Sequence, residues 1–280
     1  MLNGASRTAQ GTALQRAAHQ LFDRPLVFED PLAVRILGDA SAQLSRGRAR
    51  LSTTESANFR AFIVVRSRYA EDRLREAVTR GVRQYVLLGA GFDTFAYRNT
   101  DPALRVFELD HPATQAMKRA AVARARLPVP QTLTYQPVDL ERETVPSALE
   151  RAGFDFSRPA QVSWLGVALY LEPEAVLALV GTLVRCLAPG SELVFDFMTS
   201  LTGLDPEVRA VIEAMARFSE RSGEPHRSAF EPSDLAARLS LLGGSVVEMV
   251  GPSELTRRYL QGRTDGVTLS GAGQIARIAL

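Results

Sequence analysis

A short glycine loop stands directly after an apolar run of the sequence. Residues 84–88 are followed by Gly89, Ala90 and Gly91. At the carboxyl end of the first strand of an open α/β sheet, backbone amides meet the polar part of a ligand, and glycines let the ligand come close. The loop indicates a nucleotide-like cofactor, although a tight turn without any ligand produces the same pattern.

Carboxylates follow the next two apolar runs. Asp110 comes 19 residues after Gly91 (110 − 91), close to the spacing at which an acid accepts both ribose hydroxyls of a nucleotide. The alternative role for Asp110 is to cap the helix that begins near Pro112. Asp139 ends the third run and would accept a hydrogen bond from an adenine amino group, with Leu140 packed on the ring. Taken alone, Asp139 is more typical of a helix N-cap.

The identity of the cofactor is indicated by what the loop lacks. A dinucleotide fingerprint requires a third glycine at the position of Thr94, and the acid Asp93 beside it would repel a pyrophosphate. S-adenosylmethionine has the ribose and adenine, has no phosphate, and carries a sulfonium cation that an acidic loop suits. The residues therefore predict S-adenosylmethionine as the cofactor.

Methyl transfer from this cofactor places different demands on the protein for different acceptors. A carboxylate acceptor is already ionised at neutral pH and needs only an orienting cation. Arg98, shortly after the glycine loop, is the first candidate and Arg68 the second, although each could instead form a surface ion pair. A phenol or alcohol acceptor needs a base, for which His111 and His226 are the available imidazoles. Tyr170 is a candidate to line the methyl-transfer face, or else a core residue.

The elements that position these residues alternate between strand and helix patterns. Short runs rich in β-branched and aromatic residues are separated by segments of helical periodicity, which predicts an α/β fold with a doubly wound, mostly parallel sheet. The predicted strands are residues 84–88, 105–109, 133–138, 161–165, 192–197, 245–250 and 274–280. The predicted crossover helices are residues 94–99, 112–126, 144–152, 172–187 and 233–242.

These patterns divide the chain into four parts. Residues 1–82 are predicted to form a helical N-terminal cap, 83–200 the cofactor-binding α/β core, 201–232 a helical lid insertion, and 233–280 the remainder of the core sheet. The lid prediction rests on an amphipathic helix, expected at 205–221, that is longer than a crossover requires.

Two segments of the cap differ in pattern. Residues 41–56 are rich in serine, arginine, glycine and threonine and are expected to form a loop, whereas 59–80 shows the periodicity of a helix that ends at Gly81. The arginines of the loop lack interleaved aromatic residues, so a solvated loop is favoured over a nucleic-acid contact.

Composition limits the remaining possibilities. The 280 residues carry 33 basic and 31 acidic side chains, a net charge of +2 that favours neither nucleic acid nor a membrane surface as partner. Lys118 is the one lysine, which argues against Schiff-base chemistry, and the one cysteine excludes an internal disulfide. The three histidines are too far apart in sequence to indicate a metal site. We expect a cytoplasmic protein that acts on a small molecule or peptide, of undetermined oligomeric state.

Several motifs in order resemble one known family. GAGFDT, FELDHP and VDL, preceded by FEDPLAVRIL and VRSRYAEDRL and followed by WLGVALYL and PGSELVFDF, are similar to the leucine carboxyl methyltransferase family, within the class I S-adenosylmethionine-dependent methyltransferases. The resemblance implies a Rossmann-like, seven-stranded sheet whose last strand is antiparallel, a helical N-terminal cap, and O-methylation, including methylation in secondary metabolism. It also implies cofactor contacts from Arg66, Gly89, Asp110, Asp139 and Leu140.

The sequence departs from the family pattern at two positions. Many members have a glutamate before the glycine of the fourth-strand motif, where this chain has Leu165 before Gly166. An arginine after the GAGxDT motif is replaced by Phe95. The Leu165 departure leaves an S-adenosylmethionine-binding scaffold without catalytic activity as an alternative to an O-methyltransferase acting on a carboxylate. A nicotinamide-dependent dehydrogenase is a second rival, disfavoured by Thr94 and by the lack of a tyrosine–lysine pair for hydride transfer.

Overall fold

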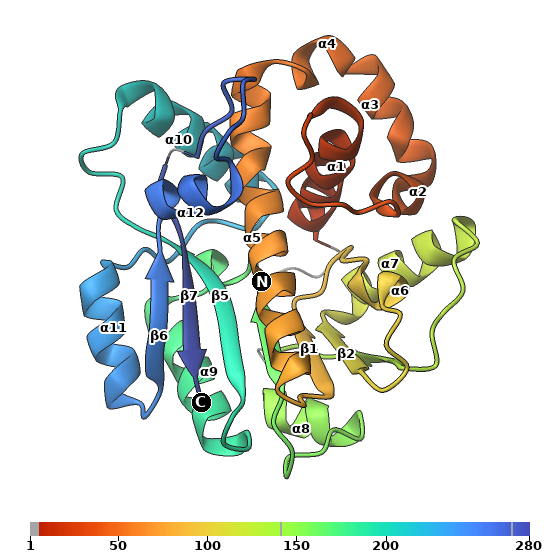
Figure 1. Ribbon diagram of the computed structural model, residues 1–280, viewed down its shortest axis with the longest axis vertical. Helices are drawn as coiled ribbons and strands as arrows, with labels where there is room; N and C mark the ends of the chain where they lie inside the picture. The colour runs from red at the N-terminus through yellow and green to blue at the C-terminus, as the bar shows by residue number, and fades with distance from the viewer. Residues whose placement is uncertain (1–5, 141, 270) are drawn as a thin grey trace.

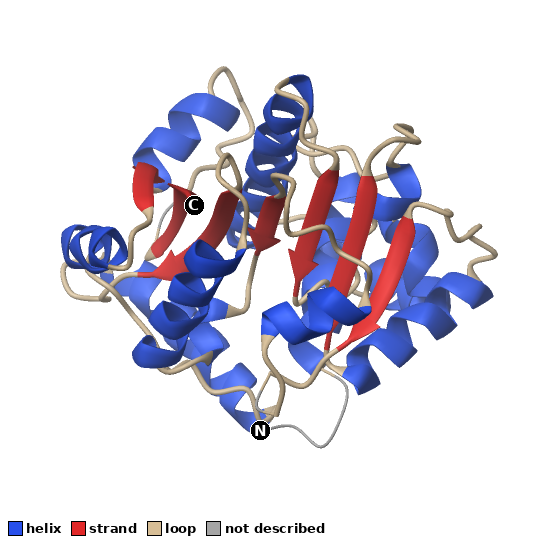
Figure 2. Cartoon of the chain, turned by 90° about the horizontal axis from the view of Figure 1, so that it is seen from below, coloured by secondary structure: helices blue, strands red, loops and turns tan. Residues whose placement is uncertain are grey.

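The computed structural model describes residues 6–140, 142–269 and 271–280, and its centre is a seven-stranded sheet with helices on both faces (Figures 1 and 2). The strand order is β3-β2-β1-β4-β5-β7-β6. All neighbouring strands are parallel except that β7 runs antiparallel to both β5 and β6. The strands are β1 (Gln84–Leu88), β2 (Arg105–Asp110), β3 (Leu133–Pro137), β4 (Gln161–Trp164), β5 (Glu192–Met198), β6 (Ser245–Val250) and β7 (Gly273–Ala279). The predicted doubly wound, mostly parallel sheet is confirmed.

Crossover helices make the parallel pairing possible, because a chain must return to the starting edge before it can pair in the same direction. The structure has these helices where the sequence predicts them: α6 (Phe95–Arg98), α7 (Pro112–Arg124), α8 (Val145–Arg151), α9 (Pro173–Cys186) and α11 (Pro232–Leu241). The last four each have a proline in the first turn. Backbone N–H groups there have no partner within the helix, so the N–H that proline lacks costs no hydrogen bond. A short 3₁₀ helix, η2 (Ala168–Tyr170), precedes α9, and α12 (Pro252–Tyr259) lies between β6 and β7.

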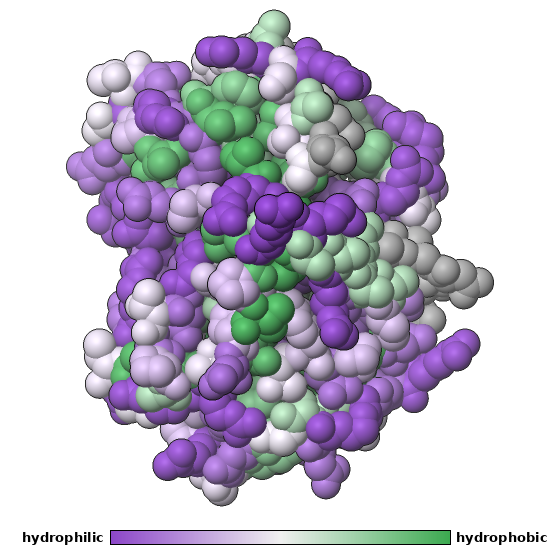
Figure 3. Space-filling model, turned by 90° about the vertical axis from the view of Figure 1, so that its right-hand side faces the viewer, coloured by the Kyte–Doolittle hydropathy of each residue, from purple (hydrophilic) through white to green (hydrophobic). Residues whose placement is uncertain are grey.

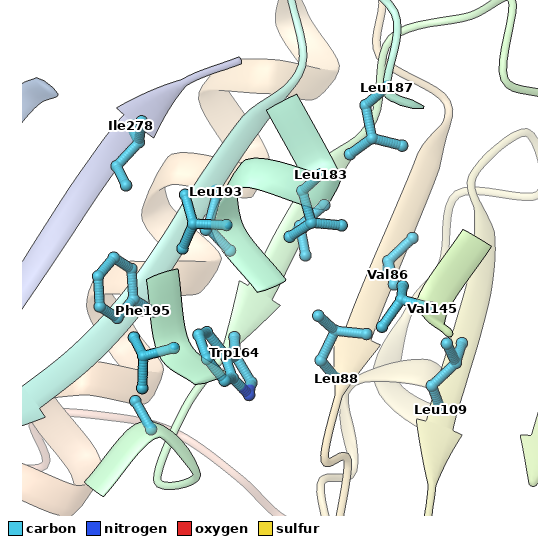
Figure 4. Close-up of a cluster of buried hydrophobic side chains, with 14 of the residues drawn as sticks. Val86, Leu88, Leu109, Val145, Trp164, Leu183, Leu187, Leu193, Phe195 and Ile278 are labelled. Carbon is cyan, nitrogen blue, oxygen red and sulfur yellow. The ribbon is translucent and has the colours of Figure 1, made fainter. Parts of the chain in front are cut away.

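The main hydrophobic core lies between the sheet and the helices α8, α9 and α11 (Figure 4). Trp164 on β4 is fully buried there and lies against Phe195 on β5, with ring centroids 5.8 Å apart. All five residues of β1 are buried, as expected of a central strand covered on both faces. The core therefore holds the carboxyl ends of β1, β2 and β4 in fixed positions.

The helical cap consists of α1 (Arg7–Phe22), α2 (Ala33–Leu37), η1 (Gly38–Ser41), α3 (Ala42–Arg46), α4 (Arg48–Leu51) and the long helix α5 (Thr54–Thr79). Figure 1 shows α1 to α4 gathered at one end of α5, which continues along the sheet. The expected loop at 41–56 is wrong, because α3 and α4 occupy much of it. Leu44 and Leu51 are buried against Ala17 and Ala18 of α1, and this long-range apolar contact outweighs the polar local composition. Helix α5 begins earlier than predicted, with Thr53 as its N-cap, whose side chain accepts from Ser56 N.

A buried polar cluster joins α1 to α5 inside the cap. The Arg60 guanidinium pairs with the Asp23 carboxylate, and His19 Nδ1 lies 2.7 Å from Asp23 Oδ2. Burial alone would raise the pKa of Asp23, but the hydrogen bonds from His19 and Arg60 lower it below its usual range. His19 Nε2 accepts from the Val27 backbone N–H at 3.1 Å, so the carboxyl end of α1 is held on both sides.

The helix predicted at 205–221 is α10 (Pro206–Arg221), capped by Asp205, whose Oδ1 accepts from Glu207 N at 2.8 Å. Most of α10 is exposed, including Val211 and Phe218.

Figure 3 shows a mostly hydrophilic face of the molecule, on which hydrophobic residues gather near the top and in a narrow strip below the centre. None of the helices in the described residues has both the length and the apolar character needed to span a bilayer.

Candidate active site

A cavity of about 890 Å³ lies at the carboxyl ends of β1, β2 and β4. This is the edge of the sheet where open α/β folds bind ligands, at the point where the strand order reverses between β1 and β4. Its wall is formed by the glycine loop, the strand ends, one face of α1, part of α5, the segment from β4 into α9, and residues 223–225 with Arg227. The predicted cofactor residues Arg66, Gly89, Ala90, Gly91, Asp110, Asp139 and Leu140 all line it.

The glycine loop has a backbone shape that side chains disfavour. Gly89 and Gly91 have φ values of +66° and +49°, in the left-handed region that glycine adopts readily. A Cβ on Gly89 would come 2.4 Å from Val167 Cγ2, whereas one on Gly91 would make an ordinary contact with Ala9 at 3.4 Å. The loop thus packs against the β4–α9 segment on one side and against α1 on the other.

Asp110 is held at the end of β2 by two backbone donors. Its Oδ2 accepts from Gly91 N at 2.5 Å and its Oδ1 from His111 N at 2.7 Å. Burial raises the pKa of this carboxyl, and the two hydrogen bonds partly oppose the shift. Since each carboxylate oxygen can accept a second hydrogen bond, the group can still receive the two hydroxyls of a ribose.

At the end of β3, Asp139 and Leu140 line the cavity beside Asp110. Asp139 Oδ2 lies 3.5 Å from Arg142 Nε, and the Asp139 carbonyl accepts from Arg142 N and Glu143 N, so the residue also begins a turn. Leu140 is 39% exposed, which leaves its side chain available to an aromatic ring. The turn and the adenine contact are therefore compatible roles for Asp139.

Arg66 reaches the cavity from α5 and is fixed by Asp196 on β5. Arg66 Nη1 lies 2.7 Å from Asp196 Oδ2, and Asp196 Oδ1 accepts from Gly166 N at 2.5 Å. The β4–β5 register pairs Trp164 with Phe195, so Asp196 follows at the level of Leu165 on the neighbouring strand. Sequence reasoning missed Asp196, for which the signal is an acid inside the apolar run LVFDFM.

Arg16 is another arginine that lines the cavity, and sequence reasoning missed it. It comes from α1 and is buried, with Nη2 2.5 Å from Asp30 Oδ2 and Nη1 3.1 Å from Asp93 Oδ2. Burial alone would raise the pKa of Asp93, but Arg16 and Arg98 lower it below its usual range. Asp93 therefore stays ionised, as the acidic loop predicted from the sequence requires.

The two arginines predicted to orient an acceptor lie outside the residues that line this cavity. Arg98 binds Glu71 on α5 through both of its terminal nitrogens and donates from Nε to Thr94 Oγ1 at 3.0 Å. Arg68 pairs with Asp72 at 2.9 Å and is 41% exposed, the surface ion pair that the sequence left as an alternative. Their role toward an acceptor stays a prediction.

Tyr170 lines the cavity, and its ring lies at 5.6 Å from that of His226 in an edge-to-face arrangement. Burial raises the pKa of Tyr170, with smaller opposing effects from hydrogen bonds to Thr8 and Ser219, so the phenol is protonated at neutral pH. His226 itself lies outside the lining residues, and burial lowers its pKa. His111 lines the cavity as the N-cap of α7, where its Nδ1 accepts from Ala113 N at 3.3 Å.

This donor and acceptor set fits S-adenosylmethionine. The glycine loop with the Asp93–Arg16 pair beside it suits the charged methionyl end. The carboxylate at the end of β2 suits the ribose, and the second acid beside an exposed leucine at the end of β3 suits the adenine. No cluster of three or more potential metal ligands occurs among the described residues.

Comparisons with known proteins agree with this assignment. The leucine carboxyl methyltransferase family model matches residues 9–184. An S-adenosyl-L-methionine-dependent methyltransferase of Bacillus subtilis, YktD, is 27% identical to this chain, and the matched region covers 95% of both chains. Another from Mycobacteroides abscessus is 36% identical over 78% of this chain and 73% of its own. The structure of a methyltransferase from Thermobifida fusca superposes with a TM-score of 0.57 at 21% identity, covering 91% of this chain and 96% of that one. The chain therefore belongs to the leucine carboxyl methyltransferase family and is an S-adenosyl-L-methionine-dependent methyltransferase.

Proposed function

We propose that this methyltransferase transfers the methyl group to a carboxylate oxygen of a small metabolite or a peptide terminus. The observation that carries the proposal is that the imidazole and the phenol among the described lining residues are both engaged in other roles. His111 is used as a helix cap next to Asp110, and Tyr170 is protonated. Glu224 lines the cavity too, with its Oε2 accepting from Thr8 N at 3.0 Å, and its replacement in the assay below tests whether it acts as a base. A carboxylate acceptor needs no base because it is ionised already.

The bound cofactor supplies an electrophilic methyl group on its sulfonium. The chain's own contribution is to hold the two reactants in line and to exclude water, and orientation of this kind can supply about 7–11 kcal/mol of the barrier. Asp110, Asp139 and the glycine loop would hold the cofactor, while the apolar side chains Leu171, Ala175 and Leu179 line the wall along α9.

Arg227 is the cavity cation best able to orient an acceptor carboxylate. Arg16 and Arg66 are buried in ion pairs with Asp30 and Asp196. Arg142 also lines the cavity, but it lies 3.5 Å from Asp139 at the end of β3, where the adenine would bind. Arg227 Nη1 lies 2.7 Å from Glu172 Oε1, but both side chains are substantially exposed, 41% and 59%, so the pair is weak. An incoming carboxylate can replace Glu172 and gain a bidentate contact.

The test is a turnover assay that measures S-adenosylhomocysteine release against matched sets of carboxylic acids, phenols and alcohols. With a carboxylate acceptor we expect a rate that is nearly flat from about pH 6 to 8.5. A rate that rises tenfold per pH unit with a phenol or alcohol, and that is lost on replacing His111, His226 or Glu224 by glutamine, would contradict the proposal.

Variants of three arginines separate the possible orienting cations. Arg227→Gln should raise KM for the acceptor on the order of tenfold, since a charged hydrogen bond is lost, with a smaller effect on kcat. Glu172→Gln is the matched control, because it removes the exposed pair and keeps Arg227. Arg98→Gln and Arg68→Gln complete the comparison, and a larger KM effect in either would return the role to the residue predicted from the sequence.

A further inference from the structure

Helix α1 covers the cofactor cavity with one of its faces. Ala9, Thr12, Ala13 and Arg16 line the cavity and are spaced as successive positions on one side of a helix. The position of Ala9 close to Gly91 places this face directly over the glycine loop. A cofactor in contact with the loop is therefore enclosed by α1.

The two halves of α1 are held differently. Its carboxyl-terminal half is anchored in the cap by the buried residues Arg16, Ala17, Ala18 and His19. In its amino-terminal half, residues 7–12 are exposed or only partly buried. Gly11 lies inside the helix, and a Cβ there would meet nothing within 4 Å beyond the helix's own backbone and the adjacent residues. A glycine inside a helix weakens it, so the first turns can separate from the cavity without unfolding the rest.

One hydrogen bond joins this amino-terminal half to the other segment that covers the cavity, residues 223–227. Glu224 Oε2 accepts from Thr8 N at 3.0 Å, although the two residues are 216 positions apart in the sequence. Glu224 is 8% exposed, and its charge lies at the positive end of the helix dipole. The Thr8 side chain and Ser219 hydrogen bond to Tyr170 alongside, and Ser6 N donates to Thr114 Oγ1 at 3.0 Å.

We propose that Glu224 is a positioning residue whose hydrogen bond to Thr8 N, termed here the latch, keeps α1 closed over the bound cofactor. Cofactor enters and leaves when the latch opens and residues 7–12 separate from the cavity. Because the cofactor touches both covering segments only in the closed state, its binding favours that state. The proposal depends on S-adenosylmethionine binding and is independent of whether the acceptor is a carboxylate.

The experiment measures the dissociation rate of S-adenosylhomocysteine from the full-length protein by displacement with excess S-adenosylmethionine. Glu224→Ala should raise this rate by about tenfold or more, as expected for the loss of a charged hydrogen bond. Glu224→Gln is the matched control, because its amide oxygen can still accept from Thr8 N, and its rate should stay within about threefold of the parent.

A second pair of variants acts on the donor. Thr8→Pro removes the N–H in the first helical turn, where proline is tolerated, and should raise the rate as Glu224→Ala does. Thr8→Ala keeps the N–H and controls for the lost hydroxyl. In the double variant Glu224→Ala/Thr8→Pro the effects should not add, because both remove the same bond.

Gly11→Ala provides a test that does not depend on a destabilised protein. A Cβ fits there and strengthens the helix, so dissociation should slow by about two- to fivefold. Hydrogen exchange of residues 7–12 should rise in Glu224→Ala and fall in Gly11→Ala, with residues 16–22 unchanged.

An unchanged dissociation rate in Glu224→Ala would overturn the latch. An effect of Glu224→Ala that Thr8→Pro does not reproduce would also overturn it, and would place Glu224 in direct contact with the cofactor.

Discussion

At the scale of single residues, Asp110 shows how the backbone prepares an acid for its ligand. Two N–H donors, from Gly91 and His111, fix the orientation of the carboxylate and oppose the rise in pKa that burial causes. Both donors belong to segments that line the cavity. The carboxylate is thus oriented by the same loops that would contact the cofactor.

Asp110→Ala should weaken S-adenosylmethionine binding by about 2–4 kcal/mol, roughly 30- to 1000-fold in Kd, because charge-assisted hydrogen bonds to the ribose are lost. Isothermal titration calorimetry measures the change directly. Asp234→Asn, an exposed acid on α11, serves as the control for a general effect of charge. An unchanged Kd in folded Asp110→Ala protein would remove Asp110 from the cofactor site.

The residue types at the strand ends were predictable because a residue that directly follows an apolar run in the sequence also lies at the end of that strand in the structure. Gly89, Asp110 and Asp139 each follow an apolar run directly, and the structure places all three around one cavity. Ion pairing was not predictable in this way. Arg98 lies close to the loop in sequence, but its guanidinium is taken by Glu71, 27 residues earlier on another helix.

At the scale of elements, the β1–α6 loop and the segment after β4 depend on each other. Gly89 lies against Val167, so the shape of the loop is set partly by a side chain 78 positions later (167 − 89). A substitution at Gly89 therefore affects folding as well as the cofactor.

Gly89→Ala should destabilise the protein for two separable reasons. The left-handed backbone contributes roughly 1–2 kcal/mol, and the approach of Cβ to Val167 Cγ2 adds to it. Gly89→Ala/Val167→Ala should recover the second part only. Gly262→Ala, at φ +79° with no atom within 4 Å, isolates the backbone part in the same urea-unfolding assay. Equal losses in Gly89→Ala and Gly262→Ala would show that Val167 moves aside freely.

The order of strands and crossover helices could be predicted from periodicity, because each element buries its own apolar face. The segment 41–56 could not, since α3 and α4 are stabilised by contacts of Leu44 and Leu51 with α1 rather than by their local sequence. Glu224 and Asp196 were missed for a related reason. Their importance comes from the segments they touch, α1 and α5, which are far away in the chain.

At the scale of the whole molecule, a buried ion pair connects the crossover helix α7 to strand β2. Lys118 Nζ on α7 lies 2.6 Å from Glu108 Oε2 on β2, and both side chains are about 1% exposed. Burial raises the pKa of Glu108 to about 7, with Lys118 opposing the shift. The folded protein therefore binds more protons at this group than the unfolded chain does between about pH 4.5 and 7.

The free energy of unfolding should accordingly contain a contribution from Glu108 that is fully present below about pH 4.5 and is lost as the pH rises through about 7. Its slope is at most about 1.4 kcal/mol per pH unit. Urea unfolding of the parent and of Glu108→Gln from pH 5 to 8 tests this, because only the parent has the titrating group. The stability difference, parent minus variant, should fall with pH; a difference that stays constant would contradict the assignment.

Trp164 gives this molecule a built-in optical probe. It is the single tryptophan of the chain, it is fully buried at the end of β4, and the helical cap contains none. Fluorescence excited at the tryptophan band therefore reports the environment of the central sheet and is blind to the cap, while far-ultraviolet circular dichroism reports the helices of both. Comparing the two signals through one denaturation curve distinguishes a cap that melts separately from a molecule that unfolds in one step.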